Sequence, residues 1–214
     1  HDIRAPVGSI ITLLEMQRTS KRIESEDVLF ARIESYAQSS LQLADDFVHL
    51  ARAQEQNYRS ELLDLGLLAD QAVSDCWTQA QQQNVQLVFE LPETEASVHG
   101  DPGLLHRAVI NLLTNAIKYG KPQDSDQAAI VECRIVEDAQ SWGIAVRDHG
   151  PGMDEASLTK LSQPFERLQQ HERMDGVGLG LAFTRTVAQR HGGSLQITSS
   201  LGHGSTFTLH IPKA

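Results

Sequence analysis

The chain has 214 residues, 40% of them hydrophobic, and its 28 acidic side chains outnumber its 18 basic ones, for a formal net charge of −10. This composition is typical of a globular protein, and the negative charge argues against nucleic acid or an anionic membrane surface as a partner. No apolar run approaches the roughly 20 residues of a membrane-spanning helix, and the first residues do not read as a signal peptide. The two cysteines, and nine histidines without metal-ligand spacing, indicate a reducing compartment and no zinc site. We therefore expect a soluble, cytosolic-type chain of two domains or one large one.

The first sixty residues are predicted to form a helical hairpin. Only two of the 15 glycines precede residue 100, and a polar break at 20–27 separates two stretches with helical spacing. In both stretches the side chains of the seam alternate spacings of four and three residues. They are Ile3, Val7, Ile10 and Leu14, then Leu29, Ile33, Tyr36, Ser40, Leu43, Phe47 and Leu50. Because one hairpin cannot bury two seams, we expect two chains to pair into a four-helix bundle. The alternative is a hairpin that packs on its own second domain.

From about residue 62 the pattern becomes that of an α+β domain. An amphipathic helix to about residue 83 and a strand at 85–91 come first. A helix at 104–119 follows Asp101 as N-cap and Pro102 as first helical residue. Strands at 130–136 and 142–148, a helix at 179–189, and strands at 194–198 and 205–211 complete the domain. Adjacent hairpins mixed with helices predict a sheet covered by helices on one face.

Three polar residues line the border of the apolar stripe of the helix at 104–119. At 100° per residue, Asn111, Asn115 and Lys118 fall in one row. Asparagine is a poor helix former and needs partners beside a buried face. A site for Mg²⁺ and phosphate would supply them; hydrogen bonds to a neighbouring loop would serve equally well.

Two further patterns carry chemistry. In the strand at 142–148, Asp148 shares the apolar face of Ile144 and Val146. A carboxylate on such a face needs hydrogen-bond donors, and an adenine amine could be one of them. The alternative is that Asp148 lies at the end of the strand in contact with water. The run from Gly176 to Leu181 opens a helix and suits phosphate binding, although its spacing is not that of a dinucleotide fingerprint.

Taken in order, these motifs closely resemble those of the two-component sensor histidine kinases. The resemblance rests on Asn111-Leu-Leu-Thr-Asn115-Ala-Ile-Lys118-Tyr119, Asp148-His-Gly150-Pro-Gly152, Pro164-Phe-Glu-Arg167, Gly176-Val-Gly178-Leu179-Gly180-Leu and Gly204-Ser-Thr206-Phe207. They look like the N, G1, F, G2 and final glycine boxes of that family, and His1-Asp2-Ile-Arg-Ala-Pro6 looks like its phosphoacceptor box. The chain thus resembles a kinase core whose sensor lies upstream.

The resemblance implies a fold and a site. Residues 1–56 would form the dimeric phosphotransfer hairpin, and 62–214 an α+β sandwich of the gyrase, Hsp90 and histidine kinase ATP-binding type. Asn115 would hold Mg²⁺, Asp148 the adenine amine, and His1 would be the nucleophile oriented by Asp2. The other nucleotide-binding residues implied are Asn111, Lys118, Tyr119, Gly150, Gly152, Gly176, Gly178, Leu179, Gly180 and Thr206, with residues 168–175 as a lid. The partners implied are a second copy of the chain and a response regulator, in the cytoplasm, with membrane anchoring only through upstream segments.

Different functions remain open at this point. Hydrolytic relatives of the fold use a glutamate where this chain has Asn111, which cannot act as a general base and so favours transfer to a side chain. A nucleotide-binding dimeric scaffold and a serine-directed kinase are two further hypotheses. Ala5 stands where many relatives have Thr or Asn, which predicts weak phosphatase activity, testable as a gain in Ala5→Thr.

Overall fold

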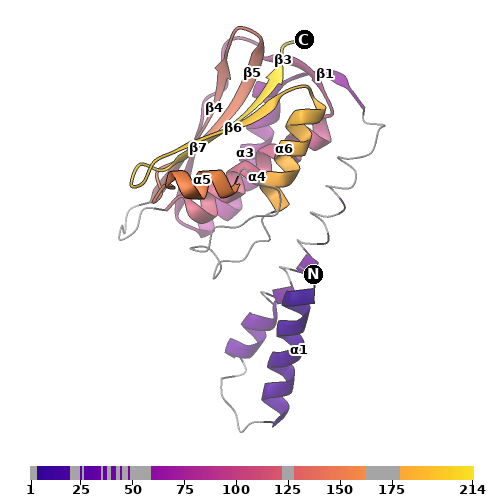
Figure 1. Cartoon of the computed structure of the whole chain (residues 1–214), viewed down its shortest axis with the longest axis vertical. Helices are drawn as coiled ribbons and strands as arrows, with labels where there is room; N and C mark the ends of the chain where they lie inside the picture. The colour runs from indigo at the N-terminus through magenta and orange to yellow at the C-terminus, as the bar shows by residue number, and fades with distance from the viewer. Residues whose placement is uncertain are drawn as a thin grey trace.

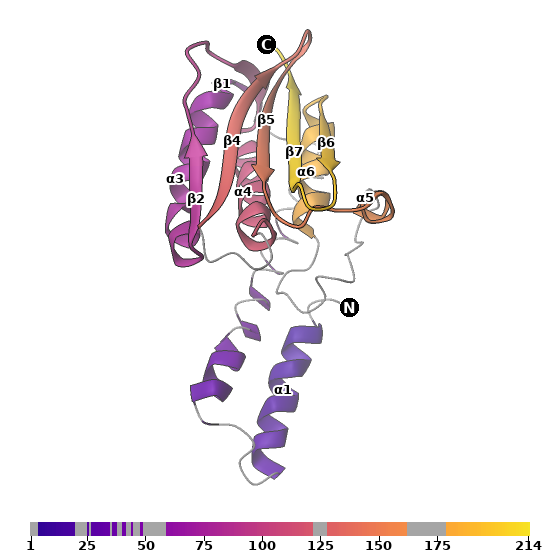
Figure 2. The same cartoon turned by 90° about the vertical axis from the view of Figure 1, so that its left-hand side faces the viewer.

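A computed structural model describes residues 4–19, 25, 27–34, 36–37, 40–41, 44, 48, 59–121, 128–161 and 179–214. Within these ranges no helix is long and apolar enough to cross a membrane. Helix α1 (Arg4–Thr19) confirms the first predicted helix and lies apart from the sheet in both views (Figures 1 and 2). Residues 27–34 are also helical.

The apolar side chains of α1 are largely uncovered. Val7, Ile11 and Leu14, at helical spacing, are 41%, 52% and 46% exposed in the single chain. In the second seam Leu29 is buried, whereas Leu43, Phe47 and Leu50 lie outside the described residues. The exposed stripe on α1 agrees with a surface that needs a partner, and the four-helix bundle stays a prediction.

The second part of the chain contains a five-stranded sheet in the order β2-β4-β5-β7-β6 (Figure 2). Its strands are β2 (Val85–Phe89), β4 (Ala129–Glu137), β5 (Ser141–Asp148), β6 (Ser194–Ser199) and β7 (Ser205–Pro212). β2 pairs with β4 in parallel, and the other pairs are antiparallel. The predicted strands are therefore all present, with boundaries that differ by one or two residues.

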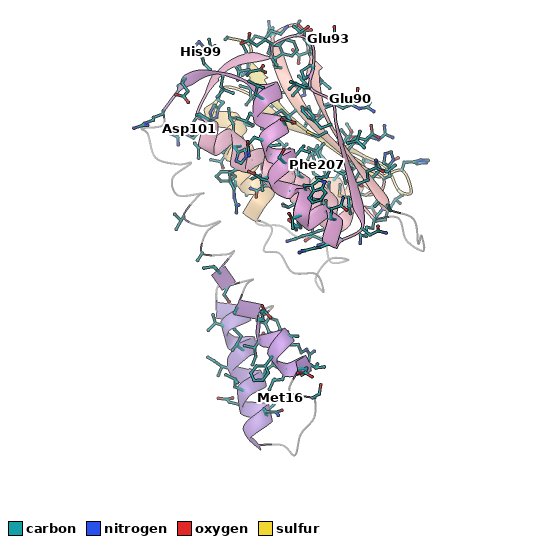
Figure 3. All side chains as sticks on the ribbon, turned by 180° about the vertical axis from the view of Figure 1, so that it is seen from behind. Met16, Glu90, Glu93, His99, Asp101 and Phe207 are labelled. Atoms are coloured by element: carbon teal, nitrogen blue, oxygen red, sulfur yellow. The ribbon has the colours of Figure 1, made fainter. Side chains whose placement is uncertain are left out.

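Helices cover one face of this sheet (Figure 2). α3 (Leu65–Gln82) packs on α4 (Pro102–Tyr119), and α4 packs on α6 (Leu179–Arg190). Asp101 accepts the Leu104 N–H at 3.0 Å and Pro102 begins α4, so the predicted cap is confirmed (Figure 3). The core lies between sheet and helices, where Phe207 is buried (Figure 3). The predicted α+β arrangement is confirmed.

Three short elements were not expected from the sequence. β1 (Glu61–Asp64) pairs with β3 (Ser97–Gly100) in a separate two-stranded sheet, and α5 (Glu155–Leu161) follows Asp154. The amphipathic stretch expected from about residue 62 to 83 contains most of β1 and then the helix α3. The helix begins at Leu65 because Asp64 is its N-cap and accepts the N–H groups of Gly66, at 2.7 Å, and Ala96, at 3.3 Å.

Candidate functional site

The Asp148 carboxylate lies at the end of β5 on the helix-covered face and is only 6% exposed. Its Oδ1 accepts the backbone N–H of Gly150 at 2.9 Å and that of Ser205 at 3.2 Å. Burial raises the pKa of the Asp148 carboxyl above its ordinary value, and these two N–H groups oppose the rise. Within the described residues Oδ2 has no hydrogen-bond donor. The site therefore presents a buried carboxylate oxygen that can accept a hydrogen bond from a ligand.

Glycines let three chain segments close around this carboxylate. A Cβ on Gly150 would lie 2.8 Å from the Tyr119 carbonyl oxygen, so the backbone after β5 touches the end of α4. Gly204 has φ +79°, and a Cβ there would lie 2.0 Å from the Asp148 carbonyl oxygen. Gly152 also has a positive φ, +65°. The structure thus brings together the ends of α4 and β5 and the turn before β7.

The row on α4 divides into two kinds of residue. Asn111 is buried, and its Nδ2 donates to the Gly180 carbonyl oxygen at 3.4 Å. The partner of this residue is therefore internal, as in the alternative to a ligand site, but it belongs to the first turn of α6 and not to a loop. Asn115 is half-buried, and no hydrogen bond to its side chain occurs within the described residues. Lys118 is half-buried in the last turn, where the helix dipole also favours a cation. Among the residues that the structure describes, Asn115 and Lys118 are therefore the two side chains of the row that are available to a ligand.

The site meets α6 at Gly180, the second residue of that helix. Its carbonyl oxygen accepts both the Asn111 amide and the Thr184 hydroxyl, the latter at 2.9 Å. Leu179 is the first residue of α6. From Asn111, beside Gly180, to Gly120, which abuts Asp148, α4 advances roughly 13 Å. The site therefore extends along one edge of α4, from the Asp148 carboxylate at one end to the start of α6 at the other.

Some predicted residues lie elsewhere or outside the described ranges. His1, Asp2, Gly176, Gly178 and residues 168–175 are outside them. Tyr119 is half-buried at the end of α4.

Thr206 does not share the face of Asp148. In β7, Thr206 pairs with Arg147 of β5 and with Thr198 of β6, so its side chain lies on the face of the sheet opposite to the helices. Its neighbour Ser205 is buried, and the Ser205 backbone N–H meets Asp148. The residue that sequence reasoning missed is therefore Ser205, and the alternation Ser205, Phe207, Leu209 of buried residues could have identified it.

His149, the residue after Asp148, contacts the face of the sheet opposite to the helices. His149 Nε2 lies 2.9 Å from Glu132 Oε1 on β4, and this contact, more than the nearby arginines, lowers the pKa of the Glu132 carboxyl. The turn that follows Asp148 is therefore fixed by contacts on both faces of the sheet: Gly150 with Asp148 on the helix-covered face, and His149 with Glu132 on the opposite face.

Comparisons with known proteins agree with this geometry. The family of histidine kinase-, DNA gyrase B- and HSP90-like ATPases matches residues 100–214. The chain is 32% identical over 217 residues to the sensor histidine kinase TrcS of Mycobacterium tuberculosis, an alignment that covers 99% of this chain and 42% of TrcS. Other curated relatives are also much longer than this chain, which covers 57%, 55%, 44% and 29% of the length of four of them.

Solved structures share the fold. The histidine kinase AdeS of Acinetobacter baumannii superposes with a TM-score of 0.75 at 22% identity, over 99% of this chain and 97% of that one. The histidine kinase ThkA, solved in complex with the response regulator protein TrrA, gives a TM-score of 0.73 at 20% identity, over 100% of this chain and 59% of that one.

Proposed function

Because the chain belongs to the family of histidine kinase-, DNA gyrase B- and HSP90-like ATPases, as its motifs predicted, we propose that it is the core of a two-component sensor histidine kinase. In this proposal it transfers the γ-phosphoryl group of ATP to His1 and then to an aspartate of a response regulator. Residues 1–56 form the phosphotransfer hairpin, and 62–214 bind ATP.

The observation that carries the proposal is the buried Asp148 carboxylate. Its Oδ1 is saturated by two backbone N–H groups, which leaves Oδ2 for the exocyclic amine of adenine. A carboxylate at 6% exposure without an external donor would cost free energy. The nucleotide then extends along α4, with its phosphates near Lys118, Gly180 and the start of α6, where a helix N-terminus favours anions.

The metal proposal is supported by the chemistry of Asn115. Its amide oxygen is a hard ligand without a partner among the described residues, which also contain no cluster of three or more His, Cys, Asp or Glu side chains. Mg²⁺ commonly takes one or two protein ligands and completes its shell with phosphate oxygens and water, so a single asparagine fits. When bound, the ion would neutralise the charge that develops on the transferred phosphoryl group.

The phosphoryl transfer itself needs a nucleophile. In the proposal a ring nitrogen of neutral His1 forms the N–P bond while the bond from the γ-phosphorus to ADP breaks, and Asp2 accepts a hydrogen bond from the other ring nitrogen. Asn111 supports transfer over hydrolysis, because its amide donates to Gly180 and can take no proton from water.

Two partners belong to the proposal. The solved structure of ThkA with TrrA, which shares this fold, supports a response regulator as phosphoryl acceptor, and the exposed stripe of Val7, Ile11 and Leu14 supports a homodimer. We also place the activity in the cytoplasm, where ATP is available, and attribute any membrane attachment to segments beyond these 214 residues.

The test is direct detection of the product. A chain extended upstream of His1 is incubated with ATP and Mg²⁺, and acid-labile phosphate is mapped by mass spectrometry. Phosphate on His1 that is lost in His1→Gln but kept in His203→Gln, a change at an exposed histidine, supports the proposal. ATP binding without phosphohistidine would instead favour the nucleotide-binding scaffold.

A further inference from the structure

His149 lies on the face of the sheet opposite to the helices, where a carboxylate of the neighbouring strand holds its imidazole. Its Nε2 lies 2.9 Å from Glu132 Oε1. The other oxygen of Glu132 pairs with the Arg134 guanidinium, and Arg147 is directly opposite Glu132 in the ladder of β4 and β5. The Glu132 side chain is only 16% exposed and that of His149 39%. The contact is therefore better shielded from water than an ordinary surface ion pair.

The direction of this hydrogen bond follows from the charge of Glu132. The contact with His149, more than the nearby arginines, lowers the pKa of the Glu132 carboxyl. The group is therefore ionised near neutral pH, and an ionised carboxylate can only accept hydrogen bonds. Nε2 of His149 must carry a proton and donate it to Glu132. Because Nε2 carries that proton in both cases, the bond is present whether the ring is neutral or charged.

The turn after Asp148 has few side chains that could hold it in place. The chain continues as His149-Gly150-Pro151-Gly152, and among these four residues His149 alone has a polar side chain. The two glycines let the backbone pack closely against the end of α4 and the turn before β7. Glycine also has the widest choice of backbone conformations, so it does not by itself keep the turn in one of them. The His149 side chain supplies the constraint that the glycines lack.

The conformation of this turn decides how the Asp148 carboxylate is presented. The Gly150 N–H donates to Asp148 Oδ1 at 2.9 Å. Burial raises the pKa of the Asp148 carboxyl, and the Gly150 N–H opposes this rise. Consecutive strand residues point to opposite faces, so a bond that fixes His149 on one face also fixes its neighbours on the other. Without that bond the Gly150 N–H would leave Asp148 part of the time, and the carboxylate would lose its orientation.

We propose that His149 is a positioning residue of the nucleotide site: its hydrogen bond to Glu132, on the face of the sheet opposite to the ligand, holds the turn at 148–152 in the conformation that presents Asp148 to the base. The proposal rests on the proposed ATP site. His149 itself does not contact the nucleotide and acts only at the base end. ATP and ADP share the base and differ only in the γ-phosphate, so the affinities for both depend equally on this bond.

The experiment measures dissociation constants of the full 214-residue chain for ATP and for ADP by calorimetry. His149→Leu removes the donor and should weaken both nucleotides by roughly tenfold, the scale of one hydrogen bond to a charged group. His149→Gln keeps an N–H group where the imidazole has Nε2, and should restore most of the affinity. His99→Leu, the same change at an exposed histidine of β3, should leave both affinities unchanged (Figure 3).

Amide hydrogen exchange, followed by NMR without nucleotide, separates positioning from general stability. The Gly150 N–H should exchange faster in His149→Leu than in the wild-type chain, because its bond to Asp148 opens more often. The Gly193 N–H, which donates to the Ala188 carbonyl oxygen at 2.9 Å, should exchange at an unchanged rate. Equal acceleration at both amides would mean that His149 only stabilises the fold, and the inference would be wrong.

A double-mutant cycle identifies the partner. Glu132→Ala should weaken both nucleotides as His149→Leu does, and the two changes together should weaken them no further. Additive effects, a His149→Gln variant as weak as His149→Leu, or a loss confined to ATP would each overturn the inference. If His149→Leu does not fold, unchanged affinities in Glu132→Ala overturn it. Failure of the wild-type chain to bind either nucleotide would instead reject the proposed function.

Discussion

At the scale of single residues, the site depends on which polar atoms remain without partners inside the protein. Asp148 Oδ1 accepts from Gly150 and Ser205, whereas Oδ2 has no donor among the described residues and can accept from a ligand. On α4, Asn111 is used to hold Gly180, and Asn115, one turn later, is not used within the described residues. Similar residues therefore have separate roles, because one is paired internally and the other is not.

The first prediction concerns Asp148. Asp148→Asn keeps an oxygen for the two backbone N–H groups but replaces the free acceptor with a donor, so ATP affinity should fall by about 1–3 kcal/mol while the fold is kept. Calorimetry gives the affinity, and circular dichroism checks the fold. Asp70→Asn, at an exposed position of α3, should change neither. An unchanged affinity in Asp148→Asn would remove this residue from the base site.

The second prediction concerns Asn115. Asn115→Ala should reduce the gain in ATP affinity that Mg²⁺ provides by about tenfold, and should abolish phosphorylation of His1 without affecting dimerisation. Nucleotide binding is titrated with Mg²⁺ and again with EDTA. Thr114→Ala, a change at the preceding helix position, serves as the control. Normal phosphorylation in Asn115→Ala would mean that another residue holds the ion.

At the scale of elements, a buried histidine joins the end of α6 to the start of α4. His191 Nε2 accepts the Asp101 backbone N–H at 2.9 Å, and its Nδ1 lies 2.7 Å from the Val187 carbonyl oxygen. The imidazole therefore carries its proton on Nδ1 and is neutral. Burial lowers the pKa of His191 below its ordinary value. The orientation of α6 on α4, and hence of Gly180 beside Asn111, depends on this uncharged ring.

The third prediction is a pH dependence of stability. Because the folded pKa of His191 lies below the unfolded value of about 6.5, the unfolded chain binds more protons as the pH falls past that value. The contribution of His191 is therefore complete above about pH 6.5 and declines below it. His191→Leu should lower the free energy of unfolding at pH 7.5 by about 1–3 kcal/mol, and by less at pH 5.5.

Urea denaturation of both proteins at the two pH values measures this difference. Because the two chains differ only at residue 191, the difference between them isolates His191. A deficit of His191→Leu that grows as the pH falls would show that the ring is charged in the folded state.

At the scale of the whole molecule, the two parts of the chain differ in how much apolar surface they cover. The α+β domain buries a continuous core between its sheet and helices. On α1, by contrast, Val7, Ile11 and Leu14 remain exposed in the single chain. A second copy of the hairpin would cover this stripe, which is the physical reason to expect a dimer.

The fourth prediction tests that dimer. The wild-type chain should sediment as a dimer, and replacing Leu43 and Phe47 together with glutamate should yield monomers, because charges in a coiled-coil seam are not compensated. Leu201→Glu, at an exposed position 63% accessible between β6 and β7, should remain dimeric. A wild-type chain that is monomeric at tens of micromolar would contradict the four-helix bundle.

Sequence alone was sufficient for the features that have a local cause. The apolar period of α4 with its cap at Asp101, the alternation that puts Asp148 on the buried face of β5, and the order of the motifs all follow from the amino-acid sequence. Each depends on residues within one or two turns of helix or one strand, where periodicity and capping act directly.

Tertiary structure decided what depends on residues far apart in the chain. β1 and β3 are four residues each and pair across more than thirty residues, so neither had a sufficient local signal. Asn111 is paired with Gly180, 69 positions away. Ser205, and not the expected nucleotide-binding residue Thr206, shares the face of Asp148 because the register of β7 against β5 selects the face. Ser199 Oγ likewise accepts the Met153 backbone N–H, 46 positions away, at 2.9 Å and lies 3.0 Å from Ser205 Oγ. Hydrogen-bond partners and strand faces follow from packing and register, which form only when the whole domain folds.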